Sequence, residues 1–101
     1  EMITSKQRAY LRKLANGIDL IFQIGKSGVT EEILTQLSNA LEARELIKIH
    51  VLENSLLDVK ETCNEVAEKL SAEPVQAIGS KFVIFRPCRK PQERKIELPK
   101  K

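Results

Sequence analysis

Aromatic residues, histidine and cysteine are scarce in this 101-residue chain, which has three Phe, one Tyr, no Trp, one His and two Cys. So few rings exclude an extensive base-stacking surface, because several would have to share one face. The two cysteines, Cys63 and Cys88, are too few for a disulfide framework. Neither has a Cys or His at the spacing of a zinc site. We therefore expect no disulfide, no bound metal and no other cofactor.

Long apolar segments are also missing. The run from Phe82 to Phe85 is far shorter than the roughly 20 apolar residues that span a bilayer. The N-terminus shows no basic region followed by an apolar stretch and a small-residue cleavage site, the pattern of a secretory signal. These absences predict a cytoplasmic protein with no membrane partner.

The residues that are present suffice for one folded domain. Hydrophobic residues make up 42% and charged residues 31% of the chain, a composition typical of globular proteins. A chain of this length forms a single domain around one core. We expect the domain to cover residues 2–87. Residues 88–101 should form a basic C-terminal tail, extended or mobile because it is polar and interrupted by prolines.

Hydrophobic periodicity and capping signals predict the element order α-β-α-β-α-β-β. The expected elements are a helix capped by Thr4 and ending near Ala15, a strand over 19–24, a helix capped by Thr30, a strand over 46–52, a helix starting with a capping box at Asp58, and strands over 75–78 and 81–86. The strand-helix-strand unit implies a right-handed crossover and a parallel pair, and the final hairpin adds antiparallel pairing. The fold class is therefore α/β, with helices packed on a mixed four-stranded sheet.

Charge is distributed unevenly along the chain. Residues 1–26 carry five basic and two acidic residues, a net charge of +3, and residues 27–85 carry five basic and ten acidic residues, a net charge of −5. Residues 86–101 carry seven basic and two acidic residues, a net charge of +5. This segregation is typical of a protein that meets a polyanion with one side.

The loop Gly25-Lys26-Ser27-Gly28 joins the first strand to the helix capped by Thr30. Free backbone N–H groups and the positive end of the helix dipole attract phosphate at such a place. The glycines admit a phosphodiester backbone, Lys26 adds charge, and the hydroxyls of Ser27 and Thr30 add donors. KH domains clamp nucleotide backbones with the same Gly-x-x-Gly device. A plain turn before a helix is the alternative for so short a motif, but the lysine at its tip and the flanking basic segments favour phosphate.

Other phosphate motifs and catalysis find no support. A P-loop requires a glycine five positions before Gly25, where Leu20 stands, and a dinucleotide fingerprint requires a third glycine. His50 is an isolated histidine at a polar position of a strand, without an identifiable acid-base partner. We expect neither an enzyme nor a small-molecule substrate.

The basic tail is a second candidate contact. Taken alone it fits a solubilising terminus as well as RNA contact, but together with the loop and the first helix it favours RNA. The candidate RNA-binding residues are Gly25, Lys26, Ser27, Gly28, Thr30, Arg12, Lys13, Arg86, Arg89, Lys90, Arg94 and Lys95.

Five segments together resemble the CRM domain, named for chloroplast RNA splicing and ribosome maturation, whose stand-alone bacterial members are the YhbY-type proteins. These segments are Leu11 to Ala15, Ile24 to Glu31, Ala40 to Ile49, Ile78 to Pro87 and Arg94 to Pro99. The resemblance implies a compact α/β fold similar to the C-terminal domain of translation initiation factor three. It also assigns the Gly-x-x-Gly loop and neighbouring basic surface to RNA.

The resemblance further implies a role with precursors of the large ribosomal subunit. The expected function is therefore to assist assembly of that subunit, as a monomer that holds ribosomal RNA without chemistry. Two alternatives remain open: a module whose basic face docks an acidic protein, and a small enzyme acting on a phosphate-bearing ligand. High salt that abolishes binding to RNA but not to proteins argues against the first alternative, and nucleotide turnover would support the second.

Overall fold

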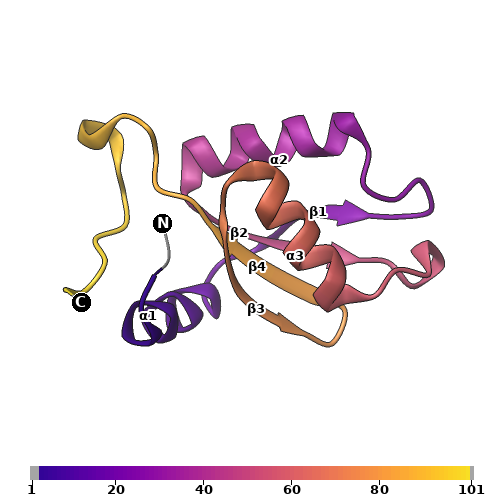
Figure 1. Ribbon diagram of the computed structural model, residues 1–101, viewed down its shortest axis with the longest axis horizontal. Coiled ribbons are helices and arrows are strands. Elements are labelled where there is room, and N and C mark those ends of the chain that lie inside the picture. The colour runs from indigo at the N-terminus through magenta and orange to yellow at the C-terminus, as the bar shows by residue number, and fades with distance from the viewer. Residues whose placement is uncertain (1–2, 101) are drawn as a thin grey trace.

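The computed structural model describes residues 3–100, except for the side chain of Ile21, and has the expected order α-β-α-β-α-β-β with two added 3-10 turns (Figure 1). The elements are α1 (Ser5–Ala15), β1 (Leu20–Ile24), α2 (Glu31–Arg44), β2 (Leu46–Val51), η1 (Glu53–Ser55), α3 (Val59–Leu70), β3 (Glu73–Ile78), β4 (Lys81–Phe85) and η2 (Pro91–Glu93). None of the helices in this part of the chain is long and apolar enough to cross a membrane.

The four strands form one mixed sheet in the order β1-β2-β4-β3. The β1–β2 pair is parallel, as the crossover through α2 requires, and the other two pairs are antiparallel. The predicted α/β class and mixed four-stranded sheet are confirmed.

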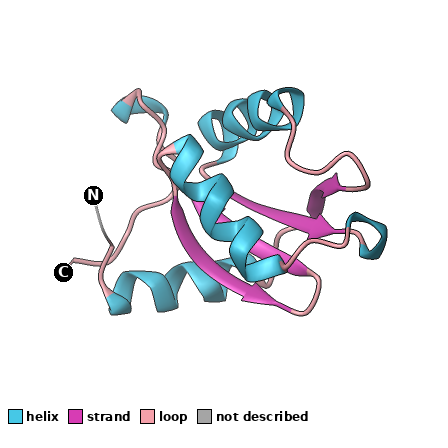
Figure 2. Cartoon of the chain, turned by 45° about the vertical axis from the view of Figure 1, so that its right-hand side comes forward, coloured by secondary structure: helices cyan, strands magenta, loops and turns pink. Residues whose placement is uncertain are grey.

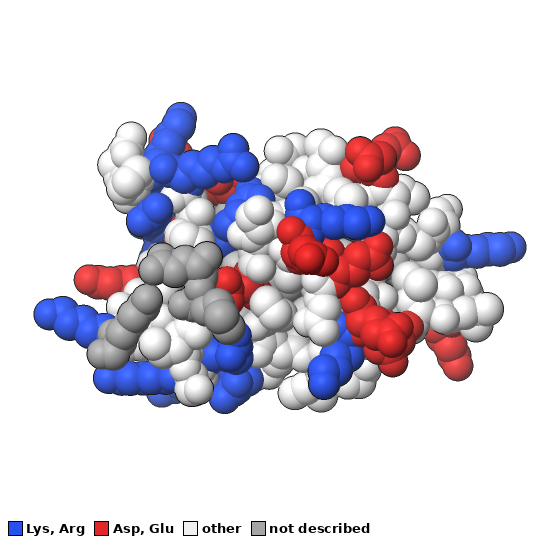
Figure 3. Space-filling model, in the orientation of Figure 1, with Lys and Arg blue, Asp and Glu red and all other residues white. Residues whose placement is uncertain are grey.

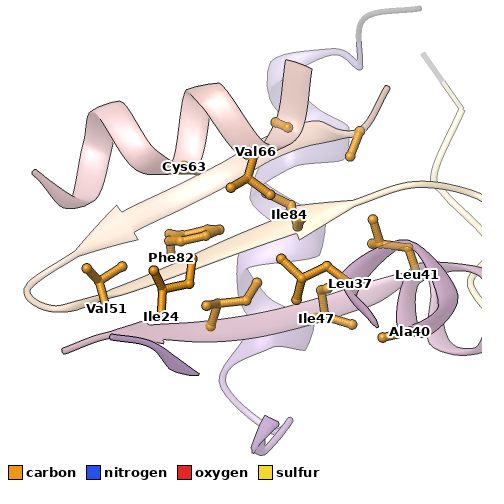
Figure 4. Close-up of a cluster of buried hydrophobic side chains, with 13 residues drawn as sticks. Ile24, Leu37, Ala40, Leu41, Ile47, Val51, Cys63, Val66, Phe82 and Ile84 are labelled. Carbon is orange, nitrogen blue, oxygen red and sulfur yellow. The ribbon is translucent and has the colours of Figure 1, made fainter. Parts of the chain in front are cut away.

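Helices cover both faces of the sheet, α2 and α3 on one and α1 on the other (Figure 2). The alternation in β2 sends Ile47, Ile49 and Val51 into the larger core, beneath α2 and α3 (Figure 4). Phe82 joins this core from β4, whereas Phe85 faces α1. Both phenylalanines are therefore core residues, and neither is available to stack on a base.

The expected caps begin all three helices. Thr4 and Gln7 form a reciprocal capping box, and the Thr30 hydroxyl accepts the N–H of Ile33 at 3.2 Å. Asp58 accepts the N–H of Glu61 at 2.9 Å. The capping box expected there is only half formed, because in the described structure the backbone N–H of Asp58 does not donate to the Glu61 carboxylate.

Up to residue 100, the C-terminal segment contains the 3-10 turn η2, with extended backbone at Lys90 and Arg94 on either side of it. The sequence did not predict that hydrogen bonds tie this segment to the rest of the domain. The segment is held by Glu45, whose side chain is 1% exposed at the end of α2. The Glu45 carboxylate accepts backbone N–H groups from Cys88 and Lys95, each at 2.7 Å, and from Ile96 at 2.8 Å. Proline content and polarity gave no sign of this anchoring, because the bonds to Glu45 come from backbone donors of the segment rather than from its side chains.

Two further contacts fasten the same segment. The backbone N–H of Arg89 donates to a Glu42 carboxylate oxygen at 3.0 Å, and the Gln7 side-chain amide donates to the carbonyl of Pro99 at 2.9 Å. Ile96 and Leu98 pack against the core beneath α1. The division into a domain of residues 2–87 and a tail of 88–101 stays a prediction about what folds by itself.

Both cysteines are free and buried. Cys63 faces the core from α3, and Cys88, although it belongs to the predicted tail, is only 2% exposed. Because burial slows the reaction of a thiol with a reagent, slow reaction of both thiols in the native protein does not indicate a disulfide.

Cys63 is expected to make the folded state less stable at high pH. Burial raises the pKa of its thiol to about 11 from an ordinary value of 9.0. As the pH rises, the thiol therefore ionises first in the unfolded chain. The contribution of Cys63 to the free energy of unfolding is fully present below pH 9.0 and falls as the pH rises towards about 11. The loss should approach about 2 to 3 kcal/mol in the free energy of unfolding, measured by urea denaturation between neutral and alkaline pH.

The control is Cys63→Ala, because it removes this thiol and leaves every other ionisable group in place. The two free energies of unfolding should converge as the pH rises. Parallel pH profiles would contradict the prediction.

Candidate nucleic-acid interface

The Gly25–Gly28 loop is a tight turn after β1. The backbone N–H of Gly28 donates to the carbonyl of Gly25 at 2.9 Å, and Gly28 has a φ of 73°, which favours glycine. A Cβ on Gly25 would lie 3.4 Å from the Leu52 side chain, so this glycine permits close packing on the chain after β2. Lys26 and Ser27 are left exposed at the tip.

The helix that follows contributes less to anion binding than its dipole suggests. Thr30 occupies the N–H of Ile33, and Glu31 and Glu32 are exposed in the first turn of α2. These carboxylates already complement the positive end of the dipole. The charge that attracts an anion to the loop is therefore that of Lys26.

The other exposed candidates lie on α1 and the C-terminal segment. Arg12 and Lys13 occupy the last turn of α1. Arg89, Lys90, Arg94 and Lys95 are exposed beyond β4, where the Arg94 Nε donates to the carbonyl of Cys88 at 2.8 Å. Because the segment is anchored, these cations have defined positions.

Arg44 is a neighbouring cation that the sequence reading missed. It lies in the last turn of α2 and lines, with Lys95 and Asp19, a cavity of about 300 Å³ beside α1. Its place in the acidic middle of the chain concealed it. The signal available in the sequence is its position in the last turn of the helix capped by Thr30, directly before the strand that begins at Leu46.

Arg86 does not lie on this surface. It is 8% exposed, and its guanidinium donates at 2.9 Å to the carbonyls of Leu70 and Ser38, at the end of α3 and within α2. Burial lowers the pKa of Arg86, while nearby Glu42 acts in the opposite direction. Because its donors face inward, we leave Arg86 out of the candidate interface.

The remaining candidates fall into two groups at opposite ends of the molecule. The loop lies at one end of the 39 Å long axis, and the C-terminal segment and α1 lie towards the other (Figure 1). On the face shown in Figure 3, basic side chains gather towards the latter end and acidic side chains over α3. The loop and the tail are thus far apart in the structure, whereas the sequence led us to expect them in one continuous RNA contact.

Residues 3–100 contain no group of three or more His, Cys, Asp or Glu side chains placed to hold a metal ion. The register sets His50 opposite Gln23 on β1 and Lys81 on β4. In this part of the chain, cationic side chains and an exposed glycine turn are the groups available to a ligand. Such groups bind anions.

Comparison with known proteins gives concordant matches. The model of the CRS1 / YhbY (CRM) domain matches residues 3–86. The probable RNA-binding protein YqeI of Bacillus subtilis is 38% identical, with 97% of this chain and 100% of that protein covered. An RNA-binding protein of Haemophilus influenzae is 33% identical, with 98% and 97% covered. A solution structure of a Staphylococcus aureus protein is 44% identical, with a TM-score of 0.75 over 97% of this chain and 100% of that one.

Proposed function

Because this chain belongs to the CRS1 / YhbY (CRM) domain family, we propose that it binds RNA and contacts the RNA backbone with its Gly25–Gly28 loop. The observation that carries the proposal is similarity over nearly the whole chain to proteins named for RNA binding. The exposed Lys26 at the tip of a glycine turn supports the assignment of the loop, since it can pair with phosphate without obstruction.

The proposed RNA surface also includes the exposed cations away from the loop. Its members are Gly25, Lys26, Ser27, Gly28 and Thr30 in and beside the loop, and Arg12, Lys13, Arg89, Lys90, Arg94 and Lys95 at the other end. An RNA that touches both groups has to extend along most of the 39 Å axis.

We assign this RNA to precursors of the large ribosomal subunit, on the strength of the family resemblance. The protein would act as a cytoplasmic monomer that holds the RNA during subunit assembly without catalysing a reaction. Binding through phosphates suits this role, because it fixes position without demanding a particular sequence.

Replacing Lys26 by alanine is expected to weaken RNA binding while leaving the fold intact. An exposed lysine contributes little to the core, and each lost phosphate contact lowers the slope of log affinity against log salt by about 0.7 on single-stranded RNA. The measurement is a salt titration of binding to fragments of large-subunit ribosomal RNA. Lys60→Ala is the control, because it removes an equally exposed charge from α3.

Equal affinity and equal salt dependence for Lys26→Ala and the unaltered protein would reduce the loop to a structural turn. Failure of the unaltered protein to bind any of the fragments would overturn the proposed function itself.

A further inference from the structure

We propose that the uncovered part of the sheet, between α1 and the β3–β4 hairpin, is a groove that binds a single-stranded segment of the RNA. This inference rests on the proposed RNA-binding function and adds a third contact, which no candidate residue from the sequence occupies.

The helix α1 covers only one end of its face of the sheet. It packs over Leu46, Val83 and Phe85. Beyond it, the strand register aligns one row of side chains across all four strands: Gln23, His50, Lys81 and Ile78. Gln23 and Lys81 are exposed, His50 is half-buried and Ile78 is 66% exposed. This face is open to solvent at the end of the sheet nearest the loop.

A groove of about 450 Å³ lies between α1 and the β3–β4 part of this row, of which Lys81 and Ile78 line it. It is lined by Asn16, Lys48, Gln76, Ile78, Gly79, Ser80, Lys81 and Val83. No acidic side chain occurs among these lining residues, and within residues 3–100 neither Lys48 nor Lys81 takes part in an ion pair. Two uncompensated lysines therefore give the groove a positive charge, in contrast to the acidic surface over α3.

The groove lies between elements that carry the two separate groups of candidate residues. Gln23, at the β1 end of the row and outside the groove, is separated from the Gly25–Gly28 loop by Ile24 alone. Asn16, at the other side of the groove, caps the helix whose last turn carries Arg12 and Lys13. An RNA strand in the groove would connect the loop with α1.

The shape and chemistry of the groove fit single-stranded RNA. Strands lie about 4.8 Å apart, so β2, β4 and β3, which line the groove, present a surface about 10 Å wide. In other sheet-based domains, a four-stranded sheet holds two or three splayed bases. Those domains stack bases on aromatic rings, whereas the only ring in this row is that of His50. Lys48 and Lys81 can pair with phosphates, and the amide of Gln76 can bond a base edge. We therefore expect binding with little base preference.

The test is a double variant, Lys48→Gln with Lys81→Gln, matched by Lys60→Gln with Lys69→Gln on α3, which removes the same charge from another face. Binding to a single-stranded uridine oligonucleotide about 20 nucleotides long is measured against salt, with circular dichroism as the folding control. The groove variant should lose up to about 1.4 of the slope of log affinity against log salt, and the control should lose none. In the unaltered protein, the same RNA should shift the NMR amide signals of Lys48, Gln76 and Lys81.

Two results would overturn the groove. One is a slope equal to that of the unaltered protein, with no shifts at these amides, while Lys26→Ala still weakens binding; the proposed function would then survive. The other is a groove variant that binds RNA as the unaltered protein does but no longer binds a polyglutamate peptide. This result would assign the groove to an acidic protein partner. Failure of the unaltered protein to bind any RNA would instead remove the proposed function.

Discussion

Replacing Glu45 by alanine is expected to lower the free energy of unfolding by about 3 to 5 kcal/mol, because one buried and two partly buried backbone N–H groups lose their acceptor. These donors belong to Cys88, Lys95 and Ile96. Each unsatisfied buried donor costs about 1 to 3 kcal/mol, and the total is less than the sum because the freed segment can turn towards water. Glu45 has a φ of 69°, and alanine meets the same backbone strain, so the difference reports the carboxylate.

Urea denaturation measures this loss, and limited proteolysis should show early cleavage within residues 88–101. Glu68→Ala, at an exposed position of α3, is the control and should change stability by less than about 0.5 kcal/mol. Glu45→Gln should fall between the two, because its amide keeps one accepting oxygen but presents an NH₂ group to the remaining donor. A Glu45→Ala protein with unaltered stability and an uncleaved C-terminal segment would contradict the anchoring role.

Replacing Arg86 by methionine is expected to cost about 2 to 4 kcal/mol of stability and to leave RNA binding unchanged. Methionine keeps the apolar stem but removes the donors that satisfy the carbonyls of Leu70 and Ser38, so the link between α3 and α2 is lost. Arg86→Lys should recover only part of the loss, since one ammonium cannot reproduce the planar fork of the guanidinium.

Arg89→Met is the matched comparison, because Arg89 is exposed three positions further along the chain. We expect the reverse pattern there: nearly unchanged stability in urea, and a smaller salt dependence of binding to ribosomal RNA fragments. A reduced salt slope in Arg86→Met, with stability unchanged, would return Arg86 to the RNA surface and contradict the buried role.

Helices and strands were predictable from the sequence because their signals are local. The spacing of Leu37 and Leu41 in α2 and the alternation of Ile47, Lys48 and Ile49 in β2 reflect periodicities that each element carries by itself. Caps such as Thr4 and Thr30 act within one turn of the chain. The parallel pair followed from the length of the crossover through α2.

The position of the loop was predictable for the same reason. Glycines on either side of an exposed lysine, between a strand and a capped helix, form a turn whatever the rest of the chain does. Its partners were not predictable. Leu52, which packs against Gly25, and the cations of the C-terminal segment, which lie at the far end, depend on how the elements assemble.

By itself, then, the sequence determined the elements, their order and the chemistry of the loop, since these depend on residues within a few positions of one another. Only the tertiary structure decided which charges are buried. Arg86 and Glu45 look like any other surface charges in the sequence, yet each satisfies backbone groups that are far away along the chain. A charged group leaves water only where the fold supplies enough hydrogen-bond partners. The hydrogen bond between Glu45 and Lys95 and the row of Gln23, His50 and Lys81 form only when the strands and helices pack together.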